Sequence, residues 1–98
     1  MKTSFFFKNF SQTEKKIFEE YIGEKIEQIN KFSGKYGENE IFLKIKAERF
    51  ATKSAYKVSM ELKLPKETLL VSEDDHTIVE AVDLAKDKLV AQLKKIKR

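Results

Sequence analysis

The chain has 98 residues, of which 41% are hydrophobic and 37% are charged, and its formal net charge at pH 7 is +4. This composition excludes a disordered chain, and the length predicts one domain over residues 1–98. The absence of cysteine excludes disulfides, thiolate catalysis and thiolate metal sites. No apolar run is long enough for a membrane span or a signal peptide, so we expect a cytoplasmic protein with no membrane partner.

The first third of the chain predicts a strand followed by a helix. Residues 2–8 form a short segment rich in apolar aromatic residues, which is typical of a strand. Ser11 and Glu14 then form a capping box, and the apolar residues after them recur at helical spacing. We therefore expect a helix over residues 12–32, with Gly34 as its C-terminal cap.

The middle of the chain changes from a helical to an alternating pattern. Residues 41–48 and 56–64 each place apolar side chains on one face and polar side chains on the other, which predicts two half-buried strands. Residues 67–72 predict the last strand, and Glu73, Asp74 and Asp75 predict an acidic loop after it. Polar or proline-bearing connections are expected at residues 33–39, 51–54 and 65–66.

Residues 77–98 predict a second amphipathic helix. Thr77 and Glu80 form a capping box, and apolar residues follow at steps of four and three. The end of this helix is strongly basic, since six cations and one acid occur from Lys86 onward. Cations suit the C-terminal end of a helix dipole, and they suit a polyanion equally well. The six are Lys86, Lys88, Lys94, Lys95, Lys97 and Arg98.

The element order β-α-β-β-β-α predicts an α+β fold. Because each helix and each long strand has one apolar face, we expect a four-stranded mixed sheet with two helices packed on one face. The first two strands are expected to be parallel, and the two hairpins add antiparallel strands. The other face of the sheet is then left to solvent or to a partner.

This open face is expected to carry aromatic side chains among charged ones. Phe6, Phe42 and Phe50 are placed there, beside Lys44 and Lys46. Such a mixture suits stacking of unpaired bases and also suits a dimer contact. A partner or a weak homodimer is the preferred interpretation, because the aromatic spacing matches no RNA-binding sheet motif.

No group of residues predicts catalysis. His76 is the one histidine and stands beside Asp74 and Asp75, whereas a general base needs an orienting partner and a zinc site needs three protein ligands. The three glycines form no phosphate-binding loop. We therefore expect a binding protein rather than an enzyme, with no cofactor, no metal and no small-molecule substrate.

The last helix resembles one known family. Its segment I-V-E-A-V-D-L-A-K-D-K-L-V-A-Q-L-K-K-I-K is similar to the second helix of the ribosome hibernation promoting factors, a family that includes the ribosome-associated inhibitor and sigma-54 modulation protein-like chains. The matching motifs are Asp87-Lys88-Leu89, Gln92-Leu93 and the closing Lys95 and Lys97. The predicted element order agrees over nearly the whole chain, and the resemblance indicates the short form of the family.

The resemblance implies a function and a set of contact residues. It implies a ribosome-associated translation inhibitor that binds ribosomal RNA of the small subunit near the decoding region and blocks mRNA and tRNA during stress or stationary phase. By position, it implies rRNA contacts from Lys25, Lys88, Lys95 and Lys97. Lys86, Lys94 and Arg98 are additional candidates for phosphate contacts, whereas Gln28 and Ala91 stand at positions that are usually basic in the family.

Two alternatives remain open from the residues themselves. A double-stranded RNA-binding module also places two helices against a sheet. An interaction protein would instead dimerise through the open sheet face.

Overall fold

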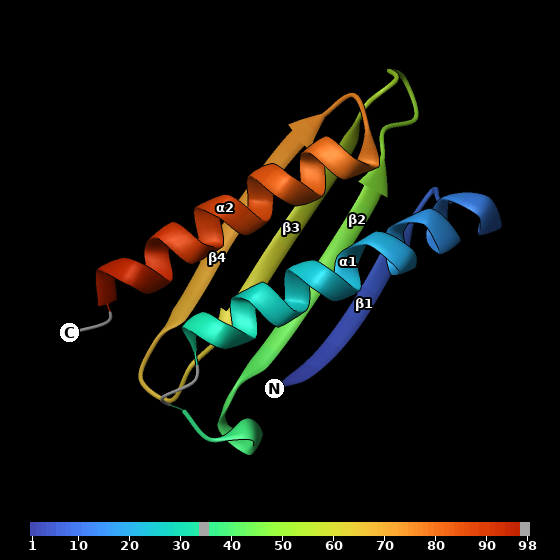
Figure 1. The fold of residues 1–98 in the computed structure, drawn as a ribbon. Helices are drawn as coiled ribbons and strands as arrows, with labels where there is room; N and C mark the ends of the chain where they lie inside the picture. The colour runs from blue at the N-terminus through green and yellow to red at the C-terminus, as the bar shows by residue number, and fades with distance from the viewer. Residues whose placement is uncertain (34–35, 97–98) are drawn as a thin grey trace.

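The structure is a computed structural model that describes residues 1–33 and 36–96 (Figure 1). Its element order is the predicted β-α-β-β-β-α, with one short 3-10 helix, η1, before the second strand. The elements are β1 (Lys2–Lys8), α1 (Gln12–Phe32), η1 (Glu38–Glu40), β2 (Phe42–Arg49), β3 (Tyr56–Lys63), β4 (Thr68–Asp75) and α2 (Ile78–Ile96).

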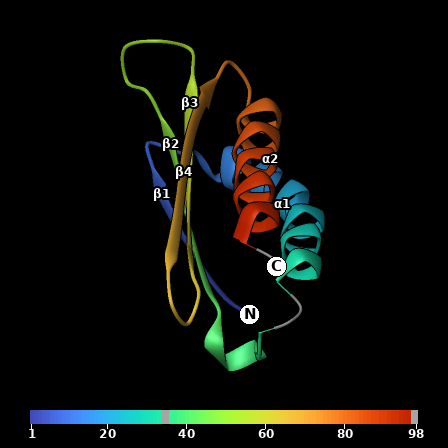
Figure 2. The ribbon, with the colours of Figure 1, turned by 90° about the vertical axis from the view of Figure 1, so that its left-hand side faces the viewer.

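The four strands form one mixed sheet in the order β1-β2-β3-β4. β1 is parallel to β2, whereas β2, β3 and β4 pair antiparallel, which confirms the predicted topology. Both helices lie on the same face of the sheet and run in the same direction, so their C-terminal ends lie at the same end of the molecule (Figures 1 and 2). The other face of the sheet carries no helix (Figure 2).

The core lies between the sheet and the helix layer. Alternate residues of β2 and β3, such as Ile45 and Met60, are fully buried and stand opposite each other in the register. Phe18 of α1 is fully buried and meets the rings of Phe7 and Phe10 edge to face. Rings packed in this geometry contribute about 1 kcal/mol per pair beyond their buried area, so α1 is firmly attached over the β1 side of the sheet.

Both ends of α1 are held by side chains. Ser11 Oγ accepts from Glu14 N at 3.1 Å, and Ser11 N donates to Glu14 Oε1 at 2.8 Å, which confirms the predicted capping box. The other carboxylate oxygen of Glu14 accepts a 2.5 Å hydrogen bond from Tyr56 Oη. At the C-terminal end the capping residue is Ser33, whose hydroxyl donates to Ile29 O at 2.9 Å. Gly34, the predicted cap, lies outside the described residues.

The last strand extends three residues beyond its predicted end, so the prediction of an acidic loop at residues 73–75 was wrong. Glu73 is on the helix-facing side of β4 and forms an ion pair with Lys88 of α2. Asp74 stands opposite Lys57 of β3 in the register. These opposite charges let acidic residues, which are rare in strands, continue the ladder.

One aromatic prediction also needs correction. β2 ends at Arg49, so Phe50 does not belong to the open strand face, and Lys53 lies over its ring with Nζ 4.5 Å from the centroid. Phe5 packs against Phe18 but is about a third exposed, because β1 is an edge strand. Phe6 and Phe42 lie on the open face as predicted.

Candidate nucleic-acid interface

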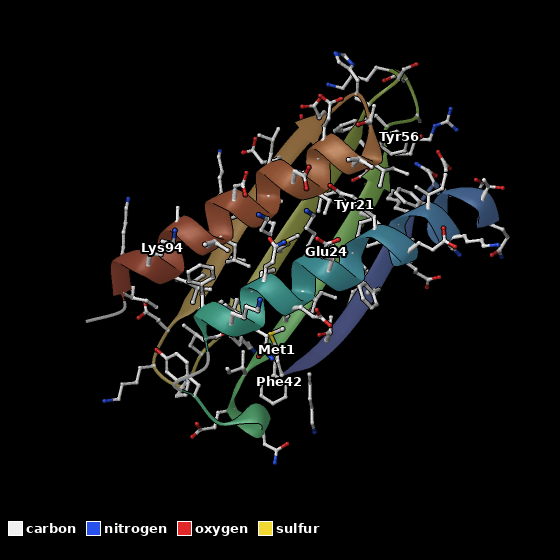
Figure 3. All side chains as sticks on the ribbon, viewed as in Figure 1. Met1, Tyr21, Glu24, Phe42, Tyr56 and Lys94 are labelled. Carbon is white, nitrogen blue, oxygen red and sulfur yellow. The ribbon has the colours of Figure 1, made fainter. Side chains whose placement is uncertain are left out.

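A polar bridge joins the middle of α1 to the second turn of α2. Tyr21 Oη of α1 donates a 2.7 Å hydrogen bond to Asp83 Oδ1 of α2. Lys25, one turn further along α1, places its Nζ 3.3 Å from the same carboxylate oxygen. Figure 3 shows Tyr21 in the space between the helices. The two helices are thus held side by side by one shared carboxylate.

The positive charge of Lys25 is neutralised within this bridge by Asp83. The Lys25 side chain is only 14% exposed. Burial works against the ammonium charge, but the hydrogen bond and charge of Asp83 outweigh burial, so the pKa of Lys25 is raised. The pKa of Tyr21 is also raised, chiefly because its hydroxyl donates to the Asp83 carboxylate. Lys25 therefore offers little free positive charge to an external anion.

The two lysines in the middle of α2 have acidic neighbours but differ in exposure, because the side chain of Lys86 is only 16% exposed. Lys88 pairs with Glu73 of β4, and Lys86 pairs with Asp87 within the helix at 2.7 Å. The side chain of Lys88 is still 61% exposed. Glu73 is only 18% exposed, so Lys88 stays beside this carboxylate, and its exposed ammonium can contact a phosphate at the same time.

The C-terminal ends of the two helices carry lysines that form no ion pair with the described residues. Lys94 Nζ lies 5.0 Å from the centroid of the Phe32 ring, at the end of α1 (Figure 3). Lys95 is exposed on the next position of α2, and Lys31 lies in the last turn of α1. Among residues 1–33 and 36–96, none of these three lysines forms an ion pair. We call Lys31, Lys94 and Lys95 the helix-end cluster; Lys97 and Arg98 lie outside the described residues.

The outer side of α1 has the opposite charge. Glu20, Glu24 and Glu27 are all exposed and recur at steps of four and three, so they form one acidic stripe. This stripe repels a polyanion from the middle of α1. The stripe was predictable from the sequence, because the three glutamates have helical spacing there. The pairing of Asp83 with Lys25 had no such signal, because it depends on how two separate helices pack.

Two positions that are usually basic in the hibernation-factor family, and are not basic in this chain, lie on the same two helices. Gln28 is half-buried on α1 and Ala91 is exposed on α2. Neither side chain carries a charge. The basic surface is therefore concentrated on the second half of α2 and on the helix-end cluster. Three of the candidate residues, Lys88, Lys94 and Lys95, lie along it, whereas Lys86 is largely covered.

His76 lies at the other end of the molecule, in an exposed position between β4 and α2. Its Nδ1 is 3.4 Å from Ser54 O, and its backbone N–H donates to Asp75 Oδ1. No set of three His, Cys, Asp or Glu residues able to hold a metal ion occurs in the described part of the chain. None of the helices within the described ranges has the length and apolarity needed to cross a membrane.

Comparison with known proteins shows the family of this chain. Its structure is similar to the Protein Y N-terminal domain of Thermus thermophilus, with a TM-score of 0.75 and 20% identity over 99% of this chain and 100% of that one. It is also similar to a ribosomal subunit interface protein from Coxiella burnetii, with a TM-score of 0.72 and 23% identity over 99% and 98% of the two chains. At these identities the likeness establishes the fold.

A search of curated protein sequences gave no significant match. The sequence profile of one family, however, matches residues 4–98, nearly the whole chain. The chain therefore belongs to the Sigma 54 modulation protein / S30EA ribosomal protein family.

Proposed function

We propose that this protein is a ribosome-associated translation inhibitor of the cytoplasm. It binds ribosomal RNA of the small subunit near the decoding region and blocks the binding of mRNA and tRNA during stress or stationary phase. Family membership supports the ribosome as the partner. The solved relative from Coxiella burnetii is a ribosomal subunit interface protein, which points to the same partner.

The helix-end cluster is the observation that carries this proposal. Two parallel helices, held together by the bridge at Asp83, bring Lys31, Lys94 and Lys95 to one end with no acidic partner among the described residues. Several lysines at one rigid surface neutralise phosphates and release counterions, which binds RNA without reading its sequence. Recognition by shape and backbone suits folded ribosomal RNA.

The proposed contacts divide into two kinds. Lys88 and Lys95 contact phosphates directly, with Lys94 beside Lys95, and Lys97 and Arg98, which follow in the sequence, add further contacts. Lys86 contributes less, because its side chain is only 16% exposed and pairs with Asp87. Lys25 acts mainly through the bridge that aligns the helices, because Asp83 already neutralises its charge. The acidic stripe of α1 faces away from the phosphate backbone.

Sedimentation with purified small subunits tests this function. The wild-type protein is expected to pellet with the subunits at low salt and to be released as salt rises. Added mRNA and tRNA should displace it, because all three compete for the decoding region. Protein that stays in the supernatant at low salt as well as at moderate salt would overturn the proposal.

The double-stranded RNA-binding alternative is separated by competition. If the protein recognises the small subunit, a plain RNA duplex at the same phosphate concentration should displace little of it. Displacement by duplex as effective as by free subunits would favour the duplex-binding module instead.

A further inference from the structure

The open face of the sheet exposes large apolar side chains on three of its strands. Phe6 of β1 is 51% exposed, Phe42 of β2 is 44% exposed, and Leu70 of β4 is 65% exposed. Their chain neighbours Phe7, Leu43 and Leu69 face the helix layer, because side chains alternate along a strand. This grouping on the side of the sheet without helices (Figure 2) marks an interaction surface rather than scattered surface residues.

The strand register aligns these side chains with lysines. Phe6 stands opposite Lys46, and Phe42 stands between Lys2 and Lys63. The two rings are therefore four residues apart along β2, about 13 Å at ~3.3 Å per residue, with Lys44 between them. We call three adjacent rows the three-row surface: Phe6, Lys46, Ser59 and Ser72; Ser4, Lys44, Glu61 and Leu70; Lys2, Phe42, Lys63 and Thr68.

The three-row surface has an excess of positive charge. It contains four lysines and a single acid, Glu61. The next row is different, because Lys8 pairs with Glu48 at 3.8 Å and Lys57 stands opposite Asp74. Within the three-row surface Lys44 stands opposite Glu61, whereas Lys2, Lys46 and Lys63 have no acidic residue opposite them.

A hollow lies in the middle of this surface. It has a volume of about 150 Å³ and is lined by Lys44, Lys46, Ser59, Met60, Glu61 and Leu70. Lys44, which lines the hollow, places its Nζ 5.8 Å from the centroid of the Phe6 ring. Stacking platforms, cations and an adjoining hollow therefore occur together on one face.

We propose that the three-row surface binds single-stranded RNA. Bases stack on Phe6 and Phe42, phosphates contact Lys44 and Lys46, and a further base enters the hollow against Leu70. Aromatic rings and lysines on an open sheet bind unpaired strands in this way, with little dependence on sequence. The surface lies on the opposite side of the sheet from the helix-end cluster, so both can be occupied at once.

Charge decides between RNA and a second copy of the chain as the occupant. Two copies meeting through this face would bring four lysines against four lysines, which repel. An RNA strand brings phosphates instead and releases their counterions. The choice of RNA over DNA rests on the proposed function, whereas the stacking surface itself does not.

Binding of a short fluorescent oligouridylate to the full chain at low salt, followed by anisotropy, tests the proposal. The wild type should bind, and F6A/F42A and K44E/K46E should each weaken binding by about tenfold or more. Matched controls are I17A, which removes an exposed apolar side chain from α1, and K16E/K66E, which reverses two exposed lysines elsewhere. Both controls should bind as the wild type does. Thermal melting of each variant establishes that it is folded.

Crosslinking gives a readout that does not depend on the variants. A photoreactive thiouridine oligomer should crosslink to peptides containing Phe6 or Phe42 in the wild-type chain. Equal binding by wild type and the sheet variants, or crosslinks confined to α2, would overturn the proposal. So would competition by polyglutamate as strong as that by RNA, or self-association of the wild type that F6A/F42A abolishes. None of these outcomes changes whether the wild-type protein pellets with small subunits. Failure of this proposal can therefore be told apart from failure of the proposed function.

Discussion

Tyr21 and Asp83 are 62 residues apart in the chain and join the two helices through a hydrogen bond of 2.7 Å. Lys25 reaches the same carboxylate, so a single acidic side chain of α2 receives two groups from α1. This contact holds the middle of α1 beside the second turn of α2. Their C-terminal ends then lie together, which is what assembles the helix-end cluster of Lys31, Lys94 and Lys95.

Loss of the bridge should weaken the fold measurably. D83A leaves the largely buried Lys25 ammonium without its counter-ion and leaves the Tyr21 hydroxyl without its acceptor. We expect the free energy of unfolding to fall by about 1.5–3 kcal/mol, the range for hydrogen bonds to charged groups. Urea denaturation at neutral pH measures it. The control E24A removes an exposed acid of the α1 stripe that has no ion pair among the described residues, and it should change stability by less than about 0.5 kcal/mol.

The capping carboxylate of Glu14 should make stability depend on acid pH. Its pKa lies below the ordinary value of 4.5, chiefly because Ser11 N–H and then Tyr56 Oη donate to it. A depressed folded-state pKa adds stability above the unfolded-state pKa and loses it as pH falls through the folded-state value. The difference in unfolding free energy between wild type and E14Q, about 0.5–1 kcal/mol at neutral pH, should therefore shrink below pH 4.5. A constant difference down to strong acid would contradict this account.

Truncation of a buried and of an exposed phenylalanine should change the free energy of unfolding by very different amounts. F18A removes a fully buried ring that packs against Phe7 and Phe10, and it should lower the free energy of unfolding by about 3–5 kcal/mol. F6A removes a ring from the open sheet face and should change stability by about 0.5 kcal/mol or less. Chemical denaturation of the two variants side by side measures both. A large loss of stability in F6A would show that this ring supports the fold rather than an interaction surface.

Binding to the small subunit should fall steeply with salt. If Lys88, Lys94, Lys95 and Lys97 each contact one phosphate, the log–log slope of affinity against salt is about −3, at about 0.7 per contact. K95A should reduce its magnitude by about 0.7, whereas K66A, in the turn between β3 and β4, should leave it unchanged. Filter binding over a series of salt concentrations measures these slopes. An unchanged slope in K95A would exclude Lys95 as a phosphate contact.

The regular parts of this fold were predictable because they depend on local pattern. The ranges of β1 and α1, the order of the strands and the parallel pairing of β1 with β2 agree with the structure. The end of β4 was not predictable in this way. Acidic residues after Ser72 favour a loop on local grounds, and they form a strand here because Lys88 and Lys57 stand beside them.

The candidate site shows the same division between local and long-range information. The exposure of Lys88 and Lys95 follows from their positions on the polar side of an amphipathic helix. The engagement of Lys25 with Asp83 does not, since helical spacing cannot say which residue of another helix lies opposite. The hollow on the open sheet face likewise depends on the register of β2, β3 and β4, which a single strand pattern does not contain.

Co-sedimentation with small ribosomal subunits at low salt, for two variants of equal charge change, tests the central claim most directly. K88E/K95E/K97E reverses two lysines in the second half of α2 and one that follows the helix in the sequence. K16E/K53E/K66E reverses three lysines outside both proposed RNA surfaces. We expect the first variant to stay in the supernatant, and the second to pellet as the wild type does. Pelleting of both variants, or the loss of both, would contradict the assignment of ribosome binding to the basic half of α2.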